Sequence, residues 1–100
     1  MKLETMVAEA AKYYEQKFNQ KPTELAIRFA EHILKVGIKL IDLGRKNAKK
    51  GVEAYPAEDF TQLAIKAFQL DPDEERDLVQ NVADLWQSYY MDGYLEGSTK

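Results

Sequence analysis

The chain has 100 residues, of which 45% are hydrophobic and 11% aromatic; this allows one folded domain and excludes a disordered segment. It contains no cysteine, which excludes disulfides, thiolate metal sites and thiol catalysis. The formal net charge is −3, and the distribution of the charges along the chain is more informative than this sum.

The first predicted helix covers residues 3–18. A short polar connection at residues 19–21 follows it, so we expect the first two helices to be antiparallel neighbours. The apolar side chains of this segment repeat at helical spacing: Leu3, Met6, Val7, Ala10, Tyr14 and Phe18.

The second predicted helix, residues 22–50, is the longest apolar-periodic stretch. Its apolar arc is about 220° wide, roughly twice what a surface helix needs. One neighbouring helix cannot cover such an arc, so either the rest of the chain or a second copy must do so. We therefore predict an all-α fold, a small antiparallel four-helix bundle built around this helix, and we expect a homodimer. A 3-4 spacing within the arc also suits a coiled-coil seam: Ala26, Phe29, Ile33, Val36, Leu40 and Leu43.

Two glycines interrupt the second helix on its apolar side. Gly37 and Gly44 each cost about 1 kcal/mol relative to alanine inside a helix. They either admit the backbone of a close neighbour or mark a bend or an early helix end. Gly51 follows the last lysine and suits a C-terminal cap.

The basic end of the second helix has two interpretations. Arg45, Lys46, Lys49 and Lys50 lie where the helix dipole favours cations. They could instead contact phosphate, and binding of nucleic acid through these four residues is the alternative function that we keep. No aromatic side chains are interleaved with them, which weakens that alternative.

Two further helices are predicted, over residues 56–69 and 72–93, with a frayed tail at 94–100. Asp71 is expected to cap the fourth helix, with Glu74 three residues later as the reciprocal partner of a capping box. Gly93 and Gly97 are four residues apart, which we read as helix termination in the tail.

The fourth helix and its tail carry a candidate docking surface. Adjacent aromatic residues cannot all face one core, and tyrosine and tryptophan are favoured at protein interfaces. Either their rings line the bundle while the hydroxyls reach solvent, or they form an aromatic patch. The candidate partner-binding residues are Asp73, Glu74, Asp77, Trp86, Tyr90 and Tyr94.

No catalytic, cofactor or metal site is expected. The acidic run at residues 71–77 lacks the central glycine of a calcium loop. His32 is the only histidine, and an acid–base pair with Glu31 is a weaker interpretation than a structural role. The chain lacks a glycine-rich phosphate loop and a nucleophile triad.

The two halves of the chain differ in charge. Residues 1–50 hold eleven Lys or Arg and six Asp or Glu, whereas residues 51–100 hold three and eleven. These complementary halves either pack together or form a bipolar surface for a charged partner. With neither a secretory signal nor a membrane span, we expect a cytoplasmic protein. The predicted function is a non-enzymatic protein-interaction module, a small bacterial or phage regulator, inhibitor or assembly factor.

Overall fold

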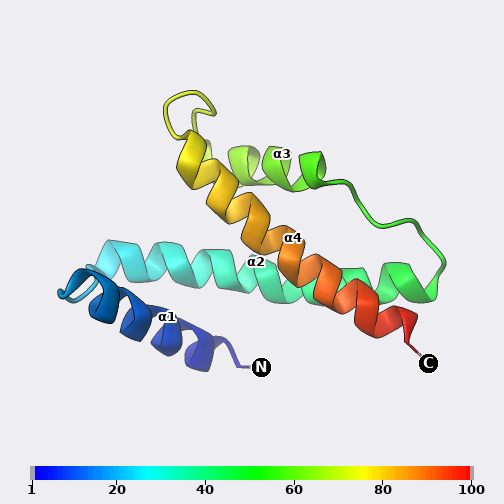
Figure 1. Cartoon of the computed structure of the whole chain (residues 1–100), viewed down its shortest axis with the longest axis horizontal. Coiled ribbons are helices and arrows are strands. Elements are labelled where there is room, and N and C mark those ends of the chain that lie inside the picture. Colours follow the sequence, from blue (N-terminus) through cyan, green and yellow to red (C-terminus); the bar gives the residue numbers. More distant parts are fainter. Residues whose placement is uncertain (1, 100) are drawn as a thin grey trace. The chain divides into compact units, whose positions relative to one another are not determined.

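The computed structural model describes residues 2–99, which form four α-helices and no strand. The helices are α1 (Leu3–Phe18), α2 (Glu24–Lys49), α3 (Ala57–Phe68) and α4 (Arg76–Ser98) (Figure 1). The prediction of an all-α helical bundle is confirmed. Contacts divide the chain into two compact units, and the boundary lies inside α2: unit 1 ends at Ile38 and unit 2 begins at Lys39.

The long second helix is continuous, and neither of its glycines breaks it. Thr23 caps its start, because its Oγ1 accepts a hydrogen bond from the backbone N–H of Ala26 at 3.1 Å. The helix therefore begins two residues after the predicted start. It ends at Lys49, one residue before the predicted end, and Gly51 adopts a φ of 75°, the left-handed conformation that favours glycine and suits the predicted C-terminal cap.

The turn before α4 is capped from Asp71, but the helix begins four residues after the predicted start, at Arg76. The Asp71 carboxylate accepts hydrogen bonds from the backbone N–H groups of Asp73 at 2.8 Å and Glu74 at 3.3 Å. The carboxylate that reaches back to the Asp71 N–H belongs to Glu75, at 3.3 Å, and not to Glu74. These bonds close a separate turn before the helix. Glu75 is the residue that directly precedes α4, so the prediction that Asp71 caps the fourth helix was wrong, and the helix starts later than predicted.

Within unit 2, three glycines bring the backbones of α2 and α4 into contact. A Cβ atom on Gly93 would overlap the carbonyl oxygen of Ile41, and one on Gly97 would lie 2.9 Å from the Cα atom of Arg45. A Cβ atom on Gly44 would in the same way overlap a carbonyl oxygen of α4. Because each glycine lacks a side chain, the helices cross more closely than ordinary side chains allow.

The end of α4 corrects the prediction of a frayed tail. The helix continues five residues past Gly93, to Ser98. The hydroxyl of Ser98 donates a hydrogen bond to the carbonyl of Tyr94 at 2.8 Å, which supports the last turn. Gly93 and Gly97 therefore serve as packing positions within a helix, and the reading of their spacing as termination was wrong.

The core of unit 2 lies between α3, α4 and the end of α2. The rings of Phe60 and Tyr90 approach to 5.3 Å between centroids, and those of Phe68 and Trp86 to 5.9 Å. Inside this core, the Asn47 side-chain amide donates a hydrogen bond to the Tyr90 hydroxyl at 3.0 Å. The buried apolar side chains of the unit are Leu40, Phe60, Ala64, Val79, Val82, Ala83, Trp86 and Tyr90.

Unit 1 consists of α1 and the first part of α2, which lie side by side (Figure 1). Asn19 ends α1 in the left-handed conformation, with a φ of 53°, and starts the turn into α2. Met6 and Leu34 are the large apolar side chains of this unit that are buried among the described residues. Unit 1 therefore has a much smaller core than unit 2.

Candidate interaction surface

The acidic turn and the outward side of α4 form one exposed surface. Asp73, Glu74 and Asp77 are all exposed, as predicted for partner-binding residues. A shallow depression lined by residues 73–78 joins the turn to Leu78, the first apolar side chain of the surface. Leu78 is 36% exposed and Leu85, two helical turns later, is 38% exposed. Carboxylates thus lie next to accessible apolar area.

Tyr89 extends this surface toward the end of α4. Leu78, Leu85 and Tyr89 are seven and four residues apart, which places them within about 40° of one another around the helix. Tyr89 is half-buried. Burial and the nearby Asp92 carboxylate raise the pKa of the Tyr89 hydroxyl, so it stays protonated and can donate a hydrogen bond.

Trp86 and Tyr90, which we had predicted to bind a partner, are both 0% exposed. The ring of Tyr90 stacks on Tyr55, with 5.1 Å between centroids, and its hydroxyl is bonded to Asn47. They point into the core of unit 2, so their assignment to an accessible patch was wrong. Both rings line the bundle, as one of the two interpretations predicted, but the Tyr90 hydroxyl is bonded to Asn47 in the core and does not reach solvent.

Tyr94 is half-buried and holds the loop between α2 and α3. Its hydroxyl donates a hydrogen bond to the carbonyl of Val52 at 2.7 Å. The N–H of Val52 in turn donates to the carbonyl of Asn47 at 2.9 Å, so both peptide groups of the loop residue are engaged. Tyr94 therefore stabilises this loop. Its role in partner binding stays a prediction.

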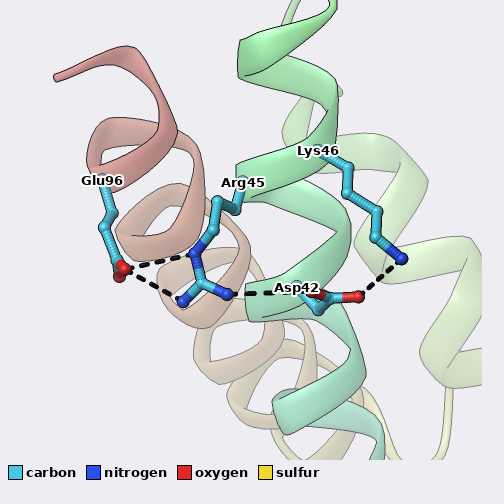
Figure 2. A network of polar contacts seen from close by, with 4 residues as sticks. All are labelled: Asp42, Arg45, Lys46 and Glu96. Atoms are coloured by element: carbon cyan, nitrogen blue, oxygen red, sulfur yellow. Dashed lines mark hydrogen bonds and ion pairs between the residues drawn. The ribbon is translucent and has the colours of Figure 1, made fainter. Parts of the chain in front are cut away.

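At the basic end of α2, two of the four predicted phosphate-binding side chains are paired with carboxylates. Figure 2 shows the Arg45 guanidinium between Glu96 of α4, at 3.0 Å, and Asp42 of α2, at 3.7 Å. Lys46 contacts Asp42 from the other side at 2.9 Å. The hydrogen bond from Lys46, together with the nearby positive charges, holds the pKa of Asp42 below its ordinary value.

This network lowers the positive potential that the end of α2 offers to phosphate. Lys49 and Lys50 are exposed, whereas Arg45 and Lys46 would have to exchange carboxylate partners for phosphate. Arg45–Glu96 is also an ion pair between the basic half and the acidic half of the chain. The pairing favours the structural interpretation of the basic end.

The structure adds no evidence for a catalytic role of His32 or for a metal site among the described residues. His32 is exposed on α2, where a shallow depression is lined by Arg28, Glu31, His32 and Lys35. Across residues 2–99, no three His, Asp or Glu side chains lie close enough together to form a metal site. No helix in that range has the length and hydropathy needed to cross a bilayer.

The predicted partner-binding residues did not include Leu78, Leu85 and Tyr89, which are apolar or aromatic positions of α4 that recur at helical spacing. The stripe that is buried follows the spacing of Val79, Val82, Ala83, Trp86, Tyr90 and Gly93. That series also has steps of three and four residues, and it contains the small residues needed for close packing. Counting alanine and glycine as core positions would have selected it.

Comparisons with known proteins give no relative from which a function could be transferred. No protein-family model, no curated protein and no solved structure matches the chain.

Proposed function

We propose that this chain is a non-enzymatic protein-interaction module that binds a basic protein surface through the outward side of α4. The surface, called here the α4 acidic surface, combines exposed carboxylates with accessible apolar side chains. Within the proposal, the module acts in the cytoplasm as a small bacterial or phage regulator, inhibitor or assembly factor. The α4 acidic surface consists of Asp73, Glu74, Asp77, Leu78, Asp84, Leu85, Tyr89 and Asp92.

The proposal rests on one observation: α4 exposes both apolar side chains and carboxylates along the same part of its surface. Leu78 and Leu85 keep more than a third of their surface exposed. Asp77 and Asp84 directly precede these leucines and lie about 100° from them around the helix, so negative charges border the apolar area on one side. Such a pattern suits a partner that presents apolar residues flanked by Lys or Arg.

The expected affinity follows from these exposures. Burying the remaining third of each leucine contributes about 0.5–1 kcal/mol, since full burial contributes about 1.5–3 kcal/mol. A micromolar complex needs about 8 kcal/mol, so the two leucines supply only a small part of it. Tyr89 and the carboxylates must provide most of the rest. We therefore expect moderate affinity and an association rate that falls as salt is added.

The test begins with the chain immobilised as bait in an extract of its host, followed by identification of the retained proteins. Each purified candidate is then titrated calorimetrically against the wild type and against the double variant Asp77→Lys, Asp84→Lys. We expect the variant to bind about tenfold more weakly or worse, because two attractive charges become repulsive. Leu85→Asp should give a loss of similar size.

A matched control separates this surface from general charge. Glu9→Lys with Glu53→Lys makes the same change in net charge at exposed positions on α1 and in the loop after α2. The control should bind within about threefold of the wild type. Equal losses in the two double variants, or wild-type binding by the α4 variants, would refute the proposed surface.

A further inference from the structure

Unit 1 leaves most of its apolar residues only half-buried. It spans fewer than about 40 residues, a size at which chains usually need a disulfide, a metal or oligomerisation to be stable. The chain has no cysteine to supply the first of these. Only Met6 and Leu34 among its large apolar side chains are buried within the described residues.

Unit 1 also contains an apolar groove between α1 and α2. The groove has a volume of about 90 Å³. A shallower depression continues from it and shares Val7, Ala11 and Ile27 with it. Small side chains at this position allow another side chain or helix to approach closely. The groove is lined by Val7, Ala10, Ala11, Tyr14, Pro22, Ala26, Ile27 and Ala30.

The same unit carries large apolar side chains that are largely exposed near the α1–α2 turn, although the ring of Phe18 also contacts that of Tyr14, with 4.8 Å between centroids. Tyr13 is 64% exposed, Phe18 is 54% exposed and Leu25 is 76% exposed. At roughly 100–150 Å² each, they expose about 350 Å² together. A standard interface takes about 800 Å² from each partner, so these three side chains by themselves supply a little under half of that area.

The charge of unit 1 is compatible with a second copy of the chain as the binding partner of its apolar surface. Residues 1–38 contain six Lys or Arg and five Asp or Glu, so two copies of unit 1 can meet without net repulsion. The exposed side of α4 is acidic, so two copies of that surface would repel each other. Projecting side chains and a groove on one unit are also what a two-fold symmetric pairing requires, because each copy supplies both parts.

We propose that two copies of the chain form a symmetric dimer through unit 1. Phe18 of each copy enters the α1–α2 groove of the other, and Leu25 is covered at the edge of the same interface. The pairing uses none of the residues of the α4 acidic surface, so the two proposals depend on different residues.

Sedimentation equilibrium of the full chain, from micromolar concentrations to the order of 100 µM, gives the oligomeric state. We expect a monomer–dimer equilibrium in the wild type. Phe18→Asp and Leu25→Asp should each weaken the dimer about tenfold or more, because each change occurs twice in a symmetric interface. Far-UV circular dichroism reports whether the variants keep their helices.

Leu95→Asp is the matched control, because Leu95 is 60% exposed and lies in unit 2. It should leave the dimerisation constant unchanged. Because the chain has no cysteine, single cysteines can be introduced to test which residues lie close together across the interface. An equimolar mixture of the Phe18→Cys and Ala11→Cys variants should form a mixed disulfide dimer under mild oxidation, and Leu95→Cys mixed with Ala11→Cys should not.

A wild type that stays monomeric over the whole range would overturn the proposal. So would a dimer that Leu95→Asp dissociates and Phe18→Asp does not. Either result leaves the α4 acidic surface untouched, since its test measures binding to a different protein through different residues.

Discussion

Replacing Gly93 by alanine tests the close crossing of α2 and α4 directly. The added methyl group would overlap the carbonyl oxygen of Ile41 and lie 2.7 Å from its carbonyl carbon. Both atoms belong to the backbone of a continuous helix, so no side-chain rotation can make room. The two helices must move apart or the local packing must be lost.

The magnitude comes from two opposing effects. Alanine is favoured over glycine in a helix interior by about 1 kcal/mol. Forcing an extra methyl group into a closely packed position costs about 1–3 kcal/mol, and more where only the backbone could yield. Because Gly93 meets backbone, we expect a net loss of about 2–3 kcal/mol, which corresponds to a fall in Tm of roughly 10–20 °C.

Chemical denaturation followed by circular dichroism measures this loss, and Gly51→Ala is the comparison. Nothing lies within 4 Å of a Cβ atom at Gly51, but its φ of 75° disfavours alanine. That variant should lose about 1 kcal/mol through conformational strain alone. Stability equal to or above the wild type in Gly93→Ala would show that the helices do not cross at backbone contact, and the reasoning would fail.

Three further predictions concern the buried Asn47–Tyr90 hydrogen bond, the pKa of Asp42 and the binding of nucleic acid. Tyr90→Phe should cost about 1–3 kcal/mol of unfolding free energy, because it leaves the buried Asn47 amide without its acceptor, and Asn47→Leu with Tyr90→Phe should cost less than the sum of the two single changes. Lys46→Met should return the pKa of Asp42 toward its ordinary value of 3.8, as measured by NMR titration. DNA and RNA should show no binding at low salt, where phosphate contacts are strongest.

Each of these predictions has an outcome that would contradict it. Full additivity of the Asn47 and Tyr90 changes would mean that the two side chains are not coupled. For Asp42, a folded-state pKa below the unfolded value stabilises the fold at pH above about 3.8, and this contribution disappears as the pH falls through the folded-state value. An Asp42 pKa that is the same in the wild type and in Lys46→Met would contradict the ion pair between Asp42 and Lys46. Salt-sensitive nucleic-acid binding lost in Lys49→Glu would restore the alternative function.

Much of the fold could be predicted because helices follow from local rules. The spacing of apolar residues identified four helices, and Asp71 and Gly51 marked a turn and a helix end by the chemistry of capping. The boundaries that went wrong depended on details that the pattern does not carry. Thr23 and not Pro22 sets the start of α2, and Glu75 and not Glu74 completes the turn at Asp71.

The candidate site was predicted less well, because a helical pattern does not say which of two neighbouring stripes is buried. Leu78, Leu85 and Tyr89 lie beside Trp86 and Tyr90 on α4, and both sets repeat at helical spacing. Alanine and glycine, which look neutral in a hydropathy pattern, decided between them by allowing α2 and α3 to approach one side of α4.

The sequence by itself determined the all-α class, the continuous apolar face of the second helix and the exposed acidic turn, because these depend on contacts within a few residues. Only the tertiary structure decided that Gly44, Gly93 and Gly97 are packing positions, that Trp86 and Tyr90 are core residues, and that Arg45 bridges α2 and α4. The physical reason is that these roles depend on residues about 50 positions apart in the chain, such as Arg45 and Glu96. Local spacing has no information about which distant backbone will approach.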